Sequence, residues 1–199
     1  MTTDKSPQHI QEYGFQLDPG ARARLLGQRP AILWFTGIPG AGKSTIANNV
    51  EMTLHRSGLL TQILDGDSIR RGLCKDLGFS NEDRLENVRR LAEVAKLMAD
   101  TGVIVLVCCI SPLRAHRELA KHVAGVHRFA EIYVQVPLPV AESRDPKGLF
   151  RLARSGMLPN LTGIDAPYEP PANPDVLINS DVVPVDQAAN AVVQWLATH

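Results

Sequence analysis

Apolar residues along this chain occur in short runs, separated by segments with helical spacing. The longest run, residues 103–110, is rich in β-branched residues, as expected for a strand buried on both faces. Residues 80–98 carry apolar side chains three and four positions apart, which is typical of an amphipathic helix. Further strands are predicted at 31–36, 59–64, 129–136 and 176–178, and further helices at 43–55, 113–123 and 185–197. This alternation predicts a parallel sheet flanked by helices, an α/β three-layer sandwich.

The remaining segments set the domain organisation. Residues 1–29 are polar and rich in turn formers, so we interpret them as an N-terminal arm in which 21–26 can form a short helix. Residues 30–199 are then one domain, since domains usually run to about 100–200 residues. Within it, residues 155–175 hold many Pro and Gly and few apolar residues, which predicts a long loop.

Composition and charge restrict the class of function. Lys and Arg together number 21, as do Asp and Glu, so the formal net charge is zero. This balance argues against a general nucleic-acid-binding protein and a polybasic membrane anchor, because both need excess positive charge. No apolar run approaches the roughly 20 residues that span a bilayer, and no secretory signal is visible. The cysteines form no CxxC pair, so we expect reduced thiols in a cytoplasmic protein and neither a disulfide framework nor a zinc site.

A phosphate-binding motif follows the first predicted strand and leads into a predicted helix. Gly37-Ile38-Pro39-Gly40-Ala41-Gly42-Lys43-Ser44 fits GxxxxGK[ST], with Thr45 next in the chain. Small residues let backbone N–H groups surround phosphate oxygens, and the start of the helix adds the positive end of its dipole. We expect Lys43 to reach the β- and γ-phosphates of a nucleoside triphosphate and the Ser44 hydroxyl to bind Mg²⁺. The alternative is a Gly-rich turn that matches by chance.

The acidic residues nearest this motif indicate the type of reaction. The apolar run 103–110 ends in Ser111-Pro112 rather than in an acid, whereas strand 59–64 runs into Asp65-Gly66-Asp67. Two carboxylates beside a phosphate loop suit a phosphotransferase, because one can help to hold Mg²⁺ and the other can take a proton from an acceptor hydroxyl. The alternative is a turn with two solvated aspartates. GTPase motifs of the NKxD type are absent from the sequence, which favours a small-molecule kinase.

Several further segments together give a specific resemblance. They are Phe35-Thr-Gly37, Leu64-Asp-Gly-Asp-Ser-Ile-Arg70, Gly72-Leu-Cys-Lys-Asp-Leu-Gly-Phe-Ser80, Asp83-Arg-Leu-Glu-Asn-Val-Arg-Arg90, Ile110-Ser-Pro112, Arg144-Asp-Pro-Lys-Gly-Leu149, Thr162-Gly-Ile-Asp165 and Pro167-Tyr-Glu-Pro170. Over about residues 31–180 the chain resembles the adenylylsulfate (APS) kinase family of P-loop kinases. The resemblance implies transfer of the γ-phosphate of ATP to the 3′-hydroxyl of adenylyl sulfate, which gives 3′-phosphoadenylyl sulfate in sulfate assimilation, with Mg²⁺.

The resemblance also assigns residues to the site. Those it places at the acceptor are Arg70, Phe79, Arg84, Asn87, Ile110, Ser111, Lys147 and, at a position that is usually Phe, Leu161. It places Arg154 near the ATP base and the region of residues 155–175 in a lid over both nucleotides. The resemblance also allows a phosphoserine at Ser111, which is not required, because direct in-line transfer needs no covalent intermediate.

The residues alone allow other interpretations. Phe79 also fits a core anchor, and Arg84 and Arg90, both candidates for the acceptor's anion, also fit solvated charges on a helix face. Leu161 offers apolar contact but no stacking, which is worth about 1–3 kcal/mol per base. We therefore expect weaker acceptor binding than in relatives with Phe, and a lower KM for adenylyl sulfate in Leu161→Phe. Ser68 and Arg71 also depart from the family's usual Asn and His.

These assignments define a main hypothesis and its rivals. Asp67 orients or deprotonates the 3′-hydroxyl, Lys43 and Mg²⁺ neutralise developing charge, and Asp65 with Ser44 holds the metal, although the sequence does not decide which aspartate is the base. The rivals are a kinase for another nucleotide-like acceptor and a non-catalytic nucleotide-binding domain. The resemblance leaves a homodimer and a separate ATP sulfurylase open as partners. The net charge is zero, yet both proposed substrates are highly charged anions, so we expect the cations to gather in one cleft: Lys43, Arg70, Arg84, Arg90, Lys147 and Arg154.

Overall fold

Five parallel strands form the centre of the fold. The computed structural model describes residue 14 and residues 16–199. The strands are β1 (Ala31–Thr36), β2 (Thr61–Asp65), β3 (Ile104–Cys108), β4 (Arg128–Gln135) and β5 (Val176–Asn179). The helices are α1 (Pro19–Leu26), α2 (Lys43–Arg56), α3 (Gly66–Arg70), α4 (Asn81–Asp100), α5 (Arg114–Ala124), α6 (Leu138–Arg144), α7 (Leu149–Arg154) and α8 (Val185–Thr198). In the sheet the strands follow the order β2-β3-β1-β4-β5.

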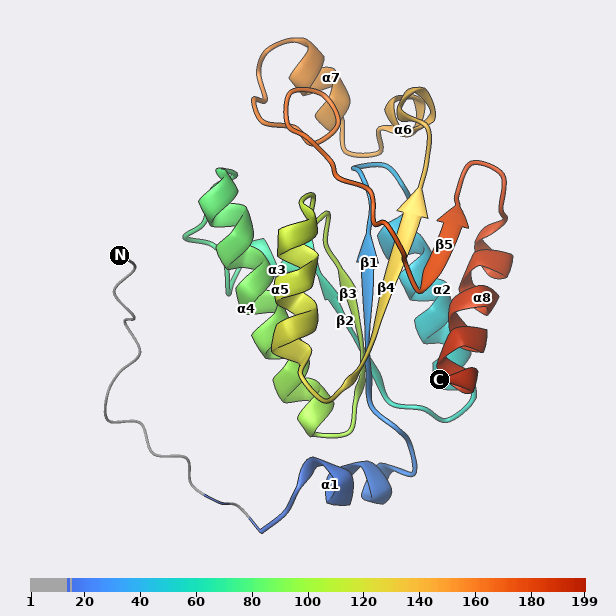
Figure 1. Ribbon diagram of the computed structural model, residues 1–199. Coiled ribbons are helices and arrows are strands. Elements are labelled where there is room, and N and C mark those ends of the chain that lie inside the picture. The colour runs from blue at the N-terminus through green and yellow to red at the C-terminus, as the bar shows by residue number, and fades with distance from the viewer. Residues whose placement is uncertain (1–13, 15) are drawn as a thin grey trace.

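Helices cover both faces of the sheet. Figure 1 shows α2 and α8 on one side of the strands and α4 and α5 on the other. Alternate residues of β1 supply both cores: Leu33 and Phe35 pack in the cluster with α2 and α8, whereas Ile32 and Trp34 pack in the cluster with α4 and α5. The predicted three-layer α/β sandwich is confirmed.

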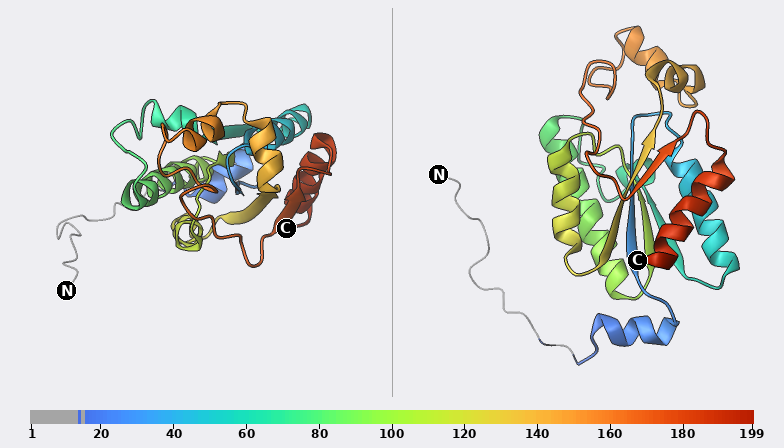
Figure 2. Two further views of the ribbon diagram at one scale, coloured as in Figure 1. Left: turned by 90° about the horizontal axis from the view of Figure 1, so that it is seen from above. Right: turned by 45° about the vertical axis from the view of Figure 1, so that its right-hand side comes forward.

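The sheet also creates the place for a site. All its strands are parallel, so their carboxyl ends meet at one edge. The central strand β1 has β3 and β2 on one side, and the chain then crosses it to add β4 and β5 on the other. Ligands of open α/β sheets bind at such a switch point. The short helices α6 and α7 stand above this edge (Figure 2).

The described part of the N-terminal arm is attached to the opposite end of the sheet. Helix α1 begins where the Asp18 carboxylate accepts the N–H of Ala21. After it, the Gln28 side chain donates to the carbonyls of Leu60 and Gly102 and accepts the N–H of Leu60. Residues 1–13 and 15 of the proposed arm lie outside the described residues.

Element boundaries differ from the predictions where contacts between distant segments set them. Strand β3 ends two residues before its predicted end, because the N–H of Cys109 makes a last bond to Phe35 and the chain then turns at Ser111, whose φ is 38°. The short helices α3, α6 and α7 were not predicted. Residues 155–175 contain no helix, as expected, and one isolated bridge between Thr162 and Ala166. No helix in the described part of the chain is long and apolar enough to cross a bilayer.

Candidate active site

The carboxyl ends of the central strands open into a cleft of about 690 Å³, within the usual size of ligand pockets. Its walls come from the phosphate loop, the segments after β2 and β3, helix α4 and the loop after α6. Most residues predicted for the site line it: Pro39, Gly40, Ala41, Gly42, Lys43, Ser44, Thr45, Asp65, Asp67, Arg70, Phe79, Arg84, Asn87, Ile110, Ser111 and Lys147. The fold thus gathers residues more than one hundred positions apart.

Glycine is required where the phosphate loop passes close to other backbone. Gly37 has a φ of 146°, and a Cβ there would lie 2.3 Å from the carbonyl oxygen of Val134. At Gly40, with φ of 73°, a Cβ would lie 2.9 Å from the carbonyl oxygen of Ala141. Gly42 precedes α2 as its N-cap and offers no side chain to cap the helix. The backbone N–H groups of the first turn are therefore left available to bind an anion in the cleft.

Lys43 lies at the base of this loop. Its Nζ donates to the carbonyl oxygens of Gly37 (2.7 Å) and Ile38 (2.9 Å), which do not themselves line the cleft. Burial lowers the pKa of Lys43 to about 8, because removal from water disfavours the charged ammonium. The ammonium is thereby held beside the position where the loop binds phosphate.

This pKa predicts the pH dependence of ATP use. Phosphate oxygens attract the protonated ammonium, so ATP prefers the form of Lys43 that predominates below its pKa. We expect kcat/KM for ATP, which reports the free enzyme, to fall as pH rises through about 8. Steady-state kinetics from about pH 6.5 to 9.5 measure this fall in kcat/KM. Lys43→Arg keeps its charge over this range, so whatever activity remains in that variant should not fall with pH. If kcat/KM of the original enzyme is unchanged across the range, the assignment of Lys43 is wrong.

The two aspartates after β2 have different surroundings. Asp65 Oδ2 accepts a hydrogen bond from Ser44 Oγ at 2.7 Å, and its Oδ1 accepts the N–H groups of Asp67 and Ser68 at the start of α3. The Asp67 carboxylate projects into the cleft, is 61% exposed and forms an ion pair with Lys147. Asp65 is therefore fixed beside the phosphate loop, whereas Asp67 is accessible to a ligand.

An aromatic ring between two arginines forms the other end of the cleft. Phe79 is 53% exposed, so its interpretation as a core anchor is wrong. The guanidinium carbons of Arg70 and Arg84 lie 4.5 Å and 5.6 Å from the ring centroid. Arg84 is buried and donates to the carbonyls of Phe79 and Asn160, so it is not a solvated helix-face charge.

Two buried polar side chains lie between these ends. Asn87 is 3% exposed, its Nδ2 contacts the Cys109 sulfur at 3.8 Å, and its Oδ1 has no hydrogen-bond partner within the described residues. Ser111 Oγ accepts from Trp34 Nε1 at 3.0 Å and donates to the Cys109 carbonyl at 3.3 Å. The Asn87 oxygen can therefore accept from a ligand, whereas the Ser111 hydroxyl already has partners.

Two predicted cations lie outside the cleft lining. Arg90 does not face the acceptor region, because it binds Asp76 and Glu86 instead. Arg154, on α7, donates two hydrogen bonds to one carboxylate oxygen of Glu142 on α6, at 2.9 Å and 2.6 Å. The expected gathering of cations in the cleft is thus correct for Lys43, Arg70, Arg84 and Lys147, and wrong for Arg90 and Arg154.

Leu161 is also placed differently from the prediction. Its carbonyl accepts N–H groups from three following residues, Ile164, Asp165 and Ala166, which closes a tight turn. The side chain is 6% exposed and packs in the core cluster with α2 and α8. A phenylalanine would meet packed core here, at a typical cost of about 1–3 kcal/mol. This arrangement does not support the expected fall in KM for Leu161→Phe.

Comparison with known proteins identifies the family. The model of the Adenylylsulphate kinase family matches residues 29–179. The chain belongs to this family. A bifunctional CysN/CysC enzyme of Xylella fastidiosa is 52% identical over 180 residues, which cover 90% of this chain and 29% of that relative. The family resemblance of the sequence motifs is confirmed.

Solved adenylylsulphate kinases share the fold. The APS kinase CysC of Mycobacterium tuberculosis, in complex with AMPPNP and APS, is 47% identical with a TM-score of 0.83, covering 85% of this chain and 99% of that chain. A hexameric APS kinase from Thiobacillus denitrificans is 28% identical with a TM-score of 0.65, covering 89% of this chain and 31% of that one. Both alignments extend over most of the present chain.

The cleft of this family member contains residues that the sequence reasoning missed. Ser180 Oγ donates to the carbonyl of Ala41 at 2.7 Å, and Arg144 donates to the carbonyl of Ser180 at 2.6 Å. Both residues line the cleft and brace the phosphate loop from the side of β5. Its position in the sequence could have indicated Ser180. It closely follows a predicted strand, and the carboxyl ends of parallel strands lie at the edge of the sheet where the site is found.

Proposed function

We propose that this chain is an adenylyl-sulfate kinase. It transfers the γ-phosphate of ATP to the 3′-hydroxyl of adenylyl sulfate, giving ADP and 3′-phosphoadenylyl sulfate for sulfate assimilation. The observation that carries the proposal is the single cleft in which a phosphate loop meets an exposed aromatic ring flanked by arginines. Membership of the family and the APS-bound state of the similar Mycobacterium tuberculosis kinase add support.

The phosphate loop and its neighbours suit the donor. Backbone N–H groups of the loop bind the phosphates, with Lys43 beside them. Ser44 Oγ and Asp65 offer hydroxyl and carboxylate oxygen, the hard ligands that Mg²⁺ prefers, and their 2.7 Å contact brings both to one point. These two residues would hold Mg²⁺ directly or through water. When bound, the ion supplies positive charge that offsets charge on the transferring phosphoryl group.

Asp67 is the group available to the acceptor hydroxyl. Asp65 already accepts hydrogen bonds at both oxygens, whereas Asp67 is exposed to the cleft and pairs with the exposed Lys147. We assign Asp67 the role of orienting the 3′-hydroxyl and accepting its proton. Lys147 can then turn to the acceptor's anion. Because the Ser111 hydroxyl is buried and engaged, direct in-line transfer without a phosphoserine is favoured.

The far end of the cleft suits adenylyl sulfate. Phe79 offers an exposed face to the adenine, a contact worth about 1–3 kcal/mol. Arg70 and Arg84 beside it supply positive charge for the phosphosulfate group. The unpartnered Oδ1 of Asn87 and the backbone of Ile110 complete the polar lining. Arg154 and Leu161 are not needed for this arrangement.

An acceptor-dependent ADP assay tests the function. ADP should form with ATP, Mg²⁺ and adenylyl sulfate together, and form only slowly when either Mg²⁺ or the acceptor is omitted. Activity with a different nucleotide acceptor and none with adenylyl sulfate would select the rival kinase. Absence of turnover with every acceptor, despite ATP binding, would select the non-catalytic domain.

The proposed metal ligand gives a separate prediction. Asp65→Asn replaces a charged oxygen ligand by a neutral amide, which should lower turnover at least about tenfold at fixed Mg²⁺ and raise the Mg²⁺ concentration for half-maximal rate. A Mg²⁺ titration of the ADP assay measures both quantities. Glu82→Gln changes an exposed acid on α4 and serves as the control. Its rate should depend on Mg²⁺ concentration as in the original enzyme. An unaltered Mg²⁺ requirement in Asp65→Asn removes Asp65 from the metal site.

Partners and compartment follow from the same proposal. The hexameric Thiobacillus denitrificans relative supports self-association, and the bifunctional Xylella fastidiosa relative supports a neighbouring enzyme, for which we propose ATP sulfurylase. Use of ATP and three free thiols, at Cys74, Cys108 and Cys109, support a cytoplasmic location. Light scattering of the purified chain, alone and with ATP sulfurylase, tests both associations.

A further inference from the structure

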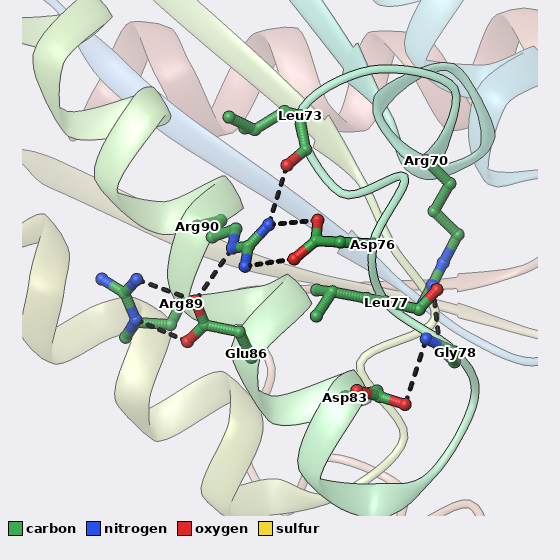
Figure 3. A network of polar contacts seen from close by, with 9 residues as sticks. All are labelled: Arg70, Leu73, Asp76, Leu77, Gly78, Asp83, Glu86, Arg89 and Arg90. Carbon is green, nitrogen blue, oxygen red and sulfur yellow. Dashed lines mark hydrogen bonds and ion pairs between the residues drawn. The ribbon is translucent and has the colours of Figure 1, made fainter.

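The loop that presents Phe79 is held from outside the cleft. Residues 71–80 connect α3 with α4 and contain neither helix nor strand. Arg90, on α4, reaches back to this loop: its guanidinium makes two parallel hydrogen bonds to Asp76, at 2.7 Å and 2.8 Å, and one to the carbonyl of Leu73 at 2.9 Å (Figure 3). Its Nε donates to Glu86 at 2.8 Å. One side chain thus holds the loop to the helix at two points, Leu73 and Asp76, and we call these contacts of Arg90 the clasp.

Further contacts of the loop come from nearer the cleft. Arg70 donates to the carbonyls of Leu77 and Gly78, and the Asp83 carboxylate accepts the N–H of Gly78 (Figure 3). Arg84 donates to the carbonyl of Phe79. Arg70 and Arg84 have proposed roles at the acceptor, so their contacts with the loop cannot be separated from direct binding. Arg90 and Asp76 do not line the cleft. Their shared contact therefore acts on a ligand through the loop rather than by touching it.

We propose that Arg90 and Asp76 are positioning residues for the acceptor, because their contact holds the loop in the shape that presents Phe79. The inference rests on the proposed function, in which Phe79 stacks on the adenine of adenylyl sulfate. A loop that is ordered before binding loses less conformational entropy when the ligand arrives. Loss of the clasp therefore weakens acceptor binding, whereas the ATP end of the cleft keeps its own contacts.

Kinetics of two single variants test this inference. Arg90→Gln is expected to raise KM for adenylyl sulfate about tenfold and to change KM for ATP less than about twofold. Asp76→Asn, at an exposed position, should raise KM for adenylyl sulfate in the same direction but by less, because Arg90 keeps its bond to the Leu73 carbonyl. The double variant should be no worse than Arg90→Gln alone, because the two changes share the Arg90–Asp76 contact. In a Phe79→Leu variant, adding Arg90→Gln should raise KM for adenylyl sulfate little further, because the ring that the loop presents is already lost. Equal KM values for adenylyl sulfate in Arg90→Gln and the original enzyme overturn the proposal.

The neighbouring arginine provides a matched control. Arg89 also pairs with Glu86, at 2.7 Å, but among the described residues it makes no hydrogen bond or ion pair with residues 71–80 (Figure 3). Arg89→Gln should leave both KM values unchanged. Hydrogen exchange of the peptide covering residues 71–80 gives a readout that needs no acceptor: exchange should accelerate in Arg90→Gln and not in Arg89→Gln. Unchanged exchange refutes the clasp itself, whereas a wild-type chain inactive with adenylyl sulfate refutes the proposed function.

Discussion

Asp67→Asn is expected to lower kcat by about 10²- to 10⁴-fold, the usual contribution of a general base. The amide keeps the size of the side chain but cannot accept the proton of the 3′-hydroxyl. Asp67 is the appropriate carboxylate because it is exposed in the cleft, whereas both oxygens of Asp65 already accept hydrogen bonds. Steady-state ADP formation should show the loss in kcat, with both KM values changed less than about threefold.

The ion pair with Lys147 supplies the comparison for this prediction. Lys147→Met also breaks the pair, but leaves the Asp67 carboxylate in the cleft. It should raise KM for adenylyl sulfate and reduce kcat far less than Asp67→Asn. If the two variants lose the same kcat, the carboxylate acts by holding Lys147, and its role as a base is wrong. Retention of full kcat in Asp67→Asn would exclude it from the reaction altogether.

The layers of the fold could be predicted because local patterns decide them. The β-branched run of β3 and the apolar spacing of α4 depend on neighbours within a few residues, and Ser80 begins α4 as expected, accepting the N–H of Asp83. Helices α6 and α7 were missed because their 7 and 6 residues are too short to show a period. Pro139, in the first turn of α6, was a signal of a helix start that the pattern alone could not use.

The site was predictable only as far as strand ends and motifs reach. Asp65 and Ser111 follow predicted strands, so their meeting at one edge was expected. The role of Arg90 depends on a loop folding back 14 residues along the chain, which helical spacing does not specify. The helical spacing did contain one indication about Arg90. At 100° per residue, Arg90 lies about 120° around the helix from Arg84, so the two side chains point to different faces of the helix and not into the same cleft.

Arg117→Met is expected to lower the free energy of unfolding by about 3–5 kcal/mol, as when one partner of a buried ion pair is removed. Arg117 is 3% exposed and its Nε donates to Glu131 at 2.5 Å. Its other nitrogens donate to the carbonyls of Ser111, at 2.8 Å, and Glu169, at 2.7 Å. Methionine would fill much of the space but leave these acceptors without a donor. The segment that follows β3 and the segment around Glu169 would then lose their common anchor.

Thermal unfolding measures this effect. For a chain of this size the expected loss corresponds to a fall in Tm of about 6–20 °C. Arg114→Ala is the matched control. Arg114 is on the same helix, and its exposed side chain donates to the carbonyl of Pro170, the residue after Glu169. That change should cost less than about 0.5 kcal/mol. Adding Glu131→Gln to Arg117→Met should recover part of the loss, because the carboxylate that remains without its partner is then neutral. A fall in Tm no larger than that of Arg114→Ala would mean that water replaces the guanidinium, and that Arg117 does not anchor the two segments.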